Sequence, residues 1–173
     1  MLYERFRERV YNVAYRVLGD RSEASDVLQD VFVLLFRKIH RYQSTAPFGS
    51  WVYRITVNVS LDHLRRRKRS PMLGASQLAL DPPVSTDDLT MPERSLALRD
   101  LRHDVQDALE SLSPRLRIVI VLRYLEDLAY ADIAEILDCS LGTVKSRLNR
   151  AHSALRSVLA SRYDPHESNE RSA

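Results

Sequence analysis

The chain has 173 residues, of which 45% are hydrophobic and 28% charged, a composition typical of a folded globular protein rather than a disordered one. Its formal net charge is only +3, its four glycines argue against a glycine-rich phosphate loop, and its single cysteine excludes an internal disulfide or a multi-cysteine zinc site. No apolar run approaches the ~20 residues that a membrane span needs, and the N-terminus carries no apolar signal segment. We therefore expect a cytoplasmic protein without direct membrane insertion.

Residues 1–69 form a first block whose apolar spacing predicts three or four helices. The first helix covers residues 2–18, and Ser22 is expected to cap the second, because a serine side chain can accept a hydrogen bond from a free backbone N–H. The second helix carries apolar side chains on more of its circumference than one core requires, Phe36 among them. A third helix is predicted over residues 48–69.

A linker is predicted over residues 70–91, which contain prolines and an acidic, hydroxyl-rich stretch without apolar periodicity. The second block, residues 92–163, has the spacing of further helices, and residues 164–173 form a polar tail that we expect to be disordered. The predicted fold class is all-α, with two small helical domains joined by a flexible linker. Helices are expected over residues 93–112, 114–124, 130–137 and 143–160, with residues 118–122 and Tyr124 in the core.

Positive charge is concentrated at the end of the third predicted helix, in Arg65-Arg66-Arg67-Lys68-Arg69. Such a run can be a solvated helix end that complements the helix dipole. The other interpretation is contact with nucleic-acid phosphates, whose counterions lysines and arginines displace. Five consecutive positive residues cover well over half of the helix circumference, which suits a nucleic-acid backbone better than a single ion pair.

The last predicted helix has no acidic residue between Gly142 and Tyr163, whereas the short helix before it is acidic. A short helix, a tight turn and a basic helix together are typical of a helix-turn-helix, whose second helix enters the major groove. Val144, Leu148 and Leu159 belong to the face expected to be buried. The opposite face carries arginine, lysine and asparagine, which recognise guanine and adenine edges. A plain surface helix is the alternative.

These motifs, in this order and spacing, resemble those of a bacterial RNA polymerase sigma factor. The matching segments are Asp26-Val-Leu-Gln29-Asp30-Val-Phe32, Trp51-Val-Tyr53-Arg54-Ile-Thr-Val-Asn58, Arg65-Arg66-Arg67, Leu112-Ser-Pro114-Arg115, Asp132-Ile-Ala134-Glu135-Ile-Leu137 and Gly142-Thr-Val-Lys-Ser-Arg147. The resemblance implies that the two blocks are regions 2 and 4 of the sigma-70 family. Nothing in this sequence corresponds to a region 1, and the linker is too short and proline-rich for the helical region 3. We therefore expect the architecture of the extracytoplasmic-function (ECF, group 4) type, which the chain resembles.

The resemblance implies that the second helix docks on the beta-prime clamp helices of core RNA polymerase. Asp26, Gln29 and Asp30 match the polar positions of that surface, with Phe36 beside them. Part of the second block is expected to meet the beta flap. The two acids could also be ordinary surface residues. A metal site at Glu23, Asp26 and Asp30 lacks further ligands at a suitable spacing.

The resemblance also implies a binding surface for the −10 promoter element in the first block. The loop containing Ser44 and Thr45 matches a family pocket for a base flipped out of the duplex, and Asn58 matches a position that helps to recognise the same element. Trp51 either stacks on DNA or belongs to the core, as its apolar helix neighbours favour. Phosphate contacts are expected from Arg65, Arg66, Arg67 and Lys68.

The second block is implied to recognise the −35 element in the major groove. The expected DNA contacts are Arg115, Thr143, Lys145, Ser146, Arg147, Asn149 and Arg150, of which Arg115 and Thr143 are expected to touch phosphates. The turn departs from the family, with Asp138 at a position that is commonly glycine and Cys139 at one that is commonly aliphatic. Aspartate tolerates the left-handed conformation better than most residues, and Cys139 is interpreted as a small buried hydrophobe.

The implied function is a promoter-specificity subunit that binds core RNA polymerase, recognises promoter DNA at its −10 and −35 elements and helps to melt it. The resemblance further implies a stress-responsive alternative sigma factor controlled by an anti-sigma factor. A polymerase-independent helix-turn-helix repressor would explain only the second block. An enzyme is disfavoured because the five histidines pair with no acid or cysteine at a catalytic or metal-ligand spacing. We expect no catalytic residue, no metal and no cofactor.

Overall fold

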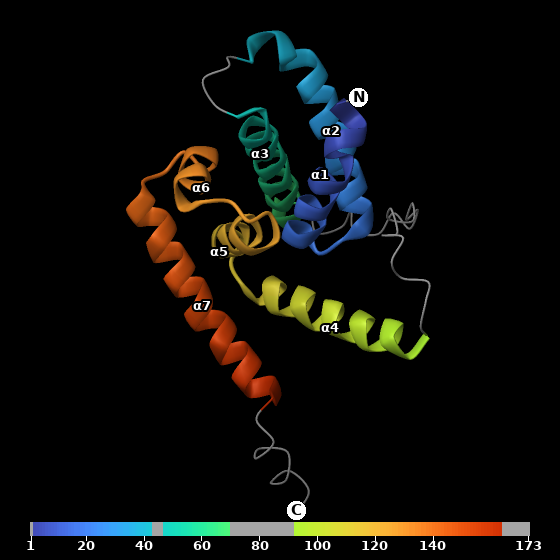
Figure 1. The fold of residues 1–173 in the computed structure, drawn as a ribbon, viewed down its shortest axis with the longest axis vertical. Coiled ribbons are helices and arrows are strands. Elements are labelled where there is room, and N and C mark those ends of the chain that lie inside the picture. Colours follow the sequence, from blue (N-terminus) through green and yellow to red (C-terminus); the bar gives the residue numbers. More distant parts are fainter. Residues whose placement is uncertain (1, 43–46, 70–91, 164–173) are drawn as a thin grey trace, which may run out of the picture.

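The computed structural model describes residues 2–42, 47–69 and 92–163, and within these ranges it is helical without a β-strand (Figure 1). The all-α prediction is confirmed. The predicted linker, the predicted tail, and Ser44 and Thr45 lie outside the described residues. The elements are α1 (Leu2–Leu18), α2 (Arg21–Lys38), the 3₁₀ turn η1 (Ile39–Arg41), α3 (Phe48–Arg69), α4 (Pro92–Ser111), α5 (Pro114–Ile120), the π-helical turn η4 (Val121–Leu125), α6 (Tyr130–Ile136) and α7 (Leu141–Tyr163).

The helices α1, α2 and α3 pack together as the first domain. Each buries the apolar stripe that its sequence spacing predicted, and Val10, Val27 and Val52 at its centre are almost completely inaccessible to solvent. The predicted N-cap of α2 is wrong. Asp20 is the cap, and its carboxylate accepts a 2.8 Å hydrogen bond from the Glu23 backbone N–H, so the helix begins one residue before Ser22.

The middle helix of the molecule, α3, is covered on two sides, by α1 and α2 on one and by α6 on the other. Its buried hydroxyl groups therefore need partners inside the helix. Thr56 Oγ1 donates to the Val52 carbonyl at 2.9 Å, and Ser60 Oγ donates to the Thr56 carbonyl at 2.8 Å. With its polar groups satisfied in this way, α3 can be buried by both halves of the chain.

In the second domain, α5, η4, α6 and α7 pack around the apolar run that was predicted to be core. The predicted helix over residues 114–124 is not continuous, because α5 changes to a π-helical turn at Val121. Tyr124 is 56% exposed instead of buried, and its hydroxyl lies 2.8 Å from Nε2 of His152. In α7, Val144 and Leu148 are buried as expected, but Leu159 is 39% exposed, because α7 extends past the rest of the domain (Figure 1).

The turn before α7 has the left-handed backbone that the sequence predicted, with φ of +48° at Asp138. Cys139 packs against the core but is only half-buried. Ser140 Oγ accepts a 3.1 Å hydrogen bond from the Thr143 backbone N–H, and α7 begins at Leu141, two residues earlier than predicted. The turn therefore ends α6 and opens α7 within a few residues, as a helix-turn-helix requires.

The two domains are packed against each other, which the sequence left open. Helix α4 and the turn η4 contact α1, and α6 contacts α3. The buried apolar residues of both domains form one connected core. Figure 1 shows α4, α5 and α6 lying directly below and beside the first domain, with α7 on the outside. The chain thus has a closed arrangement in which the second domain is seated on α1 and α3.

Candidate protein and nucleic-acid interfaces

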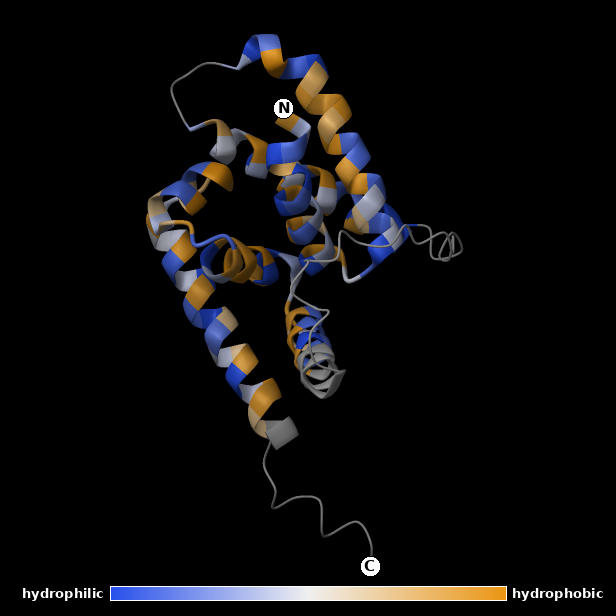
Figure 2. Cartoon of the chain, turned by 45° about the vertical axis from the view of Figure 1, so that its right-hand side comes forward, coloured by the Kyte–Doolittle hydropathy of each residue, from blue (hydrophilic) through white to orange (hydrophobic). Residues whose placement is uncertain are grey.

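The structure places the residues predicted to bind polymerase on one exposed face of α2. Asp26, Gln29 and Asp30 are exposed, and helical spacing aligns them with Val33 and Phe36. The Phe36 side chain is 84% exposed and Val33 is 48% exposed, which is unusual for neighbouring large apolar residues. Figure 2 shows hydrophobic stretches along α2. We refer to these five residues as the α2 face.

One acid of the α2 face is held in place by the neighbouring helix. Oδ2 of Asp30 lies 3.2 Å from Nε2 of His63 on α3, and the Asp30 side chain remains 55% exposed. The carboxylate is therefore fixed to α3 on one side and open to a partner on the other. This arrangement orients Asp30 without burying it.

The residues predicted to contact the −10 element lie along the exposed side of α3. Asn58 is exposed, and so are all five residues of the basic run from Arg65 to Arg69. Two of the arginines also contact acids of their own domain: Arg65 lies 2.7 Å from Asp62, and Arg67 lies 3.4 Å from Glu23. The Arg65–Asp62 pair is solvent-exposed and contributes little stability, so a phosphate can compete for the Arg65 guanidinium group, whereas the Glu23 partner of Arg67 is partly buried.

An aromatic cluster that the sequence analysis missed closes the two ends of the loop at 43–46. The ring centroids of Tyr42, Phe48 and Trp51 lie 5.1 to 5.4 Å apart. Trp51 is half-buried in this cluster, so it has both a packed and an accessible surface. The signal available in the sequence was an aromatic residue on each side of a short polar loop.

The recognition-helix prediction divides into two groups of residues. Lys145, Ser146, Asn149 and Arg150 are exposed, and their spacing of three and four residues places them together on the outer side of α7. Arg147 is half-buried, and its Nη1 lies 4.0 Å from Sγ of Cys139, so its guanidinium points toward the turn. Arg115 is exposed at the start of α5, and Thr143 is half-buried in the first turn of α7.

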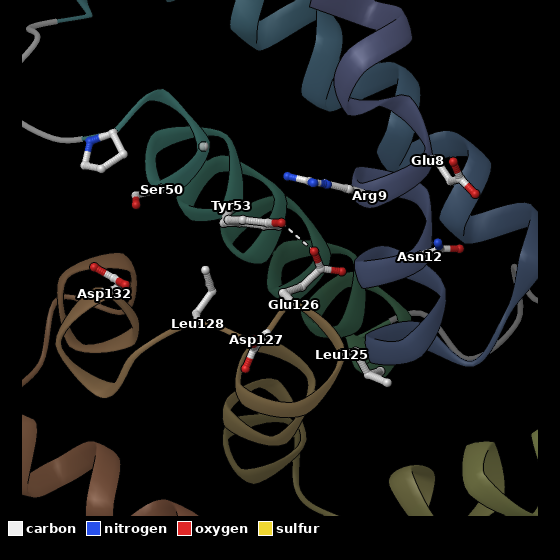
Figure 3. Close-up of a pocket in the computed structure, with 12 residues that line it drawn as sticks. Glu8, Arg9, Asn12, Ser50, Tyr53, Leu125, Glu126, Asp127, Leu128 and Asp132 are labelled. Atoms are coloured by element: carbon white, nitrogen blue, oxygen red, sulfur yellow. Dashed lines mark hydrogen bonds between the residues drawn. The ribbon is translucent and has the colours of Figure 1, made fainter.

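Polar contacts between the two domains are the site features that sequence reasoning did not find. Tyr53 on α3 donates its hydroxyl hydrogen to Oε2 of Glu126 (Figure 3). Arg54, also on α3, donates to the backbone carbonyl of Glu135 near the end of α6. Burial raises the pKa of both the Tyr53 phenol and the Glu126 carboxyl. The nearby Arg9 guanidinium acts in the opposite direction on the pKa of each group.

Arg117 joins the domains at a second point. Its side chain is buried and donates to the Val17 carbonyl at 2.5 Å, the Glu110 carbonyl at 2.8 Å and the Leu112 carbonyl at 3.2 Å. The Val17 and Glu110 carbonyls belong to the last turns of α1 and α4, where backbone acceptors lack helical partners and a positive charge is favoured. Burial lowers the pKa of Arg117, and the carbonyl groups offset the cost of desolvating its charge.

A cavity of about 590 Å³ lies between the domains beside the Tyr53–Glu126 bond (Figure 3). Its lining mixes acids of both domains with one arginine and a few apolar residues. No group of three or more histidine, cysteine, aspartate or glutamate side chains in the described ranges is placed to hold a metal ion. The lining residues are Glu8, Arg9, Asn12, Pro47, Gly49, Ser50, Tyr53, Leu125, Glu126, Asp127, Leu128 and Asp132.

Comparison with known proteins identifies both domains. Residues 2–70 match the family model for sigma-70 region 2, and residues 102–155 match the model for sigma-70 region 4. The chain is 31% identical over 159 residues to the ECF RNA polymerase sigma factor SigW of Bacillus subtilis, covering 89% of this chain and 84% of that protein. It is 37% identical over 159 residues to the ECF RNA polymerase sigma factor SigE of Mycolicibacterium smegmatis, covering 92% of this chain and 60% of that protein.

A solved structure shows the same fold. The sigma factor RpoE of Bartonella quintana, crystallised with the anti-sigma factor NepR, has a TM-score of 0.66 and 25% identity, over 91% of this chain and 93% of that one. No helix among the described residues is long and apolar enough to cross a membrane. Sigma factors are transcription initiation factors rather than enzymes. On these matches, the chain belongs to the ECF RNA polymerase sigma factors of the sigma-70 family.

Proposed function

We propose that this chain binds core RNA polymerase in the cytoplasm and directs it to promoters that carry a −10 and a −35 element. The observation that carries the proposal is the combination, in one chain, of the exposed α2 face with two separate basic surfaces, on α3 and α7. A repressor built on the helix-turn-helix would have no use for an exposed phenylalanine beside exposed carboxylates on α2, one of which, Asp30, is held in place by His63.

The α2 face is the proposed contact with the clamp helices of the beta-prime subunit. Phe36 supplies apolar area that water now covers, and Asp26 and Asp30 supply negative charge around it. An apolar anchor surrounded by charges is the usual anatomy of a protein–protein interface. The partner surface should therefore present an apolar depression flanked by lysine or arginine.

The −10 element is proposed to bind along α3. Asn58 and the basic run would face the DNA, with arginines and Lys68 on the phosphates. Ser44 and Thr45 are proposed to line a pocket for a flipped base. Unstacking one base costs a few kcal/mol, which a pocket that binds that base can offset. Half-buried Trp51, beside this loop, has an accessible ring surface on which a neighbouring base could stack.

The −35 element is proposed to bind α7 in the major groove. Lys145, Ser146, Asn149 and Arg150 share the outer side of the helix, so their side chains can reach the base edges together. A well-placed bidentate contact of arginine or asparagine contributes about 1–3 kcal/mol of discrimination between bases. Arg115, Thr143 and Arg147 are proposed as phosphate contacts that fix the helix in the groove.

The chain is proposed to consist of region 2 at residues 1–69, a flexible tether at 70–91, region 4 at 92–163 and a tail at 164–173. A tether makes the second DNA contact intramolecular, so two weak domains can bind one promoter with useful affinity. We further propose that the chain is a stress-responsive alternative sigma factor held by an anti-sigma factor, as the complex of the related RpoE with NepR supports.

The test is transcription in vitro with bacterial core RNA polymerase, a library of genomic fragments as template and this chain as the specificity factor. We expect discrete start sites preceded by two elements at a fixed spacing. Core polymerase that does not bind the chain would refute the proposal. Tight binding of a short −35 duplex by the free chain, together with absent core binding, would favour a polymerase-independent regulator instead.

A further inference from the structure

His63 of α3 contacts the α2 face through Asp30. Nε2 of His63 lies 3.2 Å from Oδ2 of Asp30, across the packed surfaces of the two helices. The His63 side chain is only 17% exposed, whereas the Asp30 side chain is 55% exposed. A largely enclosed imidazole therefore holds an acid whose other side is open to solvent.

The chemistry of the two groups determines which of them donates. An ionised carboxylate can only accept, so the hydrogen of this bond is carried by Nε2 of the imidazole. In its neutral form, an imidazole donates a hydrogen without cancelling the charge of its acceptor, whereas an arginine in the same place would be charged at every pH. His63 can thus orient the Asp30 carboxylate and leave its negative charge available.

A second pair between α2 and α3 shows how an acid with a structural role is held. Nη1 of Arg67 lies 3.4 Å from Oε2 of Glu23 and 3.4 Å from the Leu18 carbonyl. The Glu23 side chain is 28% exposed, and burial raises its pKa. Glu23 is therefore enclosed where α1, α2 and α3 meet, whereas Asp30 projects from the domain.

The two carboxylates of the α2 face differ in their freedom. Asp26 precedes Asp30 by about one helical turn, is exposed, and forms no ion pair within the described ranges of the chain. The Asp30–His63 pair is too exposed to contribute much stability. What the bond changes is the range of orientations that the Asp30 carboxylate samples before a partner binds.

Fixing the Asp30 side chain in advance favours docking. A protein that binds Asp30 has to immobilise its carboxylate, and the entropy lost on immobilising one side chain weakens affinity by roughly two- to tenfold. Because His63 already restrains Asp30 in the free chain, much of that loss does not occur on binding. The bond engages Oδ2, so Oδ1 remains open to a cation of the partner.

We propose that His63 is a positioning residue for polymerase docking, which holds the Asp30 carboxylate in the orientation that core RNA polymerase binds and leaves its charge for a lysine or arginine of the polymerase. The inference rests on the proposed function, in which the α2 face contacts the polymerase. It adds that a residue of α3, without touching the partner, sets the affinity of α2 for it.

The test measures the dissociation constant of the labelled full chain for core polymerase in the absence of promoter DNA. His63→Gln keeps an N–H donor for Asp30, and His63→Met has the same length without the donor. His63→Met should weaken core affinity by roughly two- to tenfold, whereas His63→Gln should restore the wild-type value. Equal losses in the two variants, both shown to be folded by urea unfolding, would overturn the proposal.

A double-mutant cycle tests whether His63 acts through Asp30. In an Asp30→Ala background, His63→Met should have no further effect on core affinity, because the group that it positions is gone. The matched control is Asp62→Asn, since the Asp62 side chain is also 55% exposed but pairs with Arg65 of the same helix. Asp62→Asn should leave core affinity unchanged. An equal effect of His63→Met in both backgrounds would refute the positioning role.

The same measurements separate the failure of this inference from the failure of the proposed function. If Asp30→Ala weakens core affinity and His63→Met does not, the α2 face binds polymerase but His63 does not position it. If Asp30→Ala and Phe36→Ala both leave core affinity unchanged, the assignment of the α2 face itself is wrong, and the inference fails with it.

Discussion

The exposed phenylalanine on α2 allows a test in which binding and stability should separate. Phe36 is 84% exposed, so the free chain gains almost nothing from its side chain, and Phe36→Ala should change the free energy of unfolding by less than about 0.5 kcal/mol. If core polymerase buries the ring, the same substitution removes most of the ~1.5–3 kcal/mol that a fully buried phenylalanine contributes. At ~1.4 kcal/mol per factor of ten, we expect core affinity to fall by roughly tenfold to hundredfold.

The assay is the dissociation constant of the labelled chain for core polymerase, with urea unfolding of the free variant alongside. Leu159→Ala is the matched control, because it removes an exposed apolar side chain from α7, far from the α2 face, and should leave core affinity unchanged. Leu35→Ala on the buried side of the same helix should instead cost about 2–5 kcal/mol of stability. Unchanged core affinity of Phe36→Ala would refute the assignment of the α2 face.

Three further substitutions address the DNA surfaces and the domain junction. Asn149→Ala should weaken binding of the −35 element by about 1–3 kcal/mol and relax specificity at one base pair. Transcription from promoters that vary at that position would reveal the relaxed specificity. A uniform loss of transcription on all promoters would instead indicate that Asn149 contacts a phosphate. Arg66→Ala should weaken promoter binding on all sequences and reduce the salt dependence of the affinity by about one phosphate contact; an unchanged salt slope would exclude this role. Arg117→Met should cost about 2–4 kcal/mol of stability in urea unfolding, because the backbone carbonyls of Val17, Glu110 and Leu112 lose a buried donor. A change below about 0.5 kcal/mol would contradict the role given to Arg117.

The features that the sequence predicted correctly depend on local spacing. The apolar stripes of α1, α2 and α7 follow the 3.6-residue period, and the left-handed turn at Asp138 depends on one residue's backbone preference. The sequence also indicated the exposed α2 face, because the second predicted helix had more apolar residues than one core could bury. Local rules fail where two signals compete, as at the start of α2, where Asp20 and Ser22 are both good caps and the aspartate prevails.

The features that the sequence did not predict depend on residues far apart in the chain. Arg117 bonds a backbone carbonyl exactly 100 positions earlier, and every residue has such a carbonyl, so no pattern marks the partner. The role of Tyr53 at the domain junction could not be predicted, because its acceptor lies 73 residues away in the other domain. Tyr124 is exposed because it lies in the π-helical turn η4, whose wider winding changes the direction of that side chain from the one a continuous α-helix would give it.

The carboxyl at the domain junction gives the closed arrangement a pH dependence whose sign is fixed by the structure. Burial raises the pKa of Glu126 above its ordinary value, while the Tyr53 hydrogen bond and the Arg9 charge lower it by less. A carboxyl with a raised folded pKa binds more protons when folded than when unfolded. Its contribution to stability is therefore present below the unfolded pKa and is lost as pH rises through the folded pKa.

We accordingly expect the closed chain to resist urea better near pH 5 than near pH 7. Burial also raises the pKa of Glu23, which adds to the slope with the same sign, and Glu8, Asp127 and Asp132 line the same cavity. The contribution of Glu126 is isolated by Glu126→Gln, which stays neutral at every pH and can still accept from Tyr53. The unfolding free energy of the wild type relative to this variant should fall as pH rises from 4.5 to 7. A difference that stays flat or rises would contradict a net penalty on the ionised carboxylate where the two domains meet.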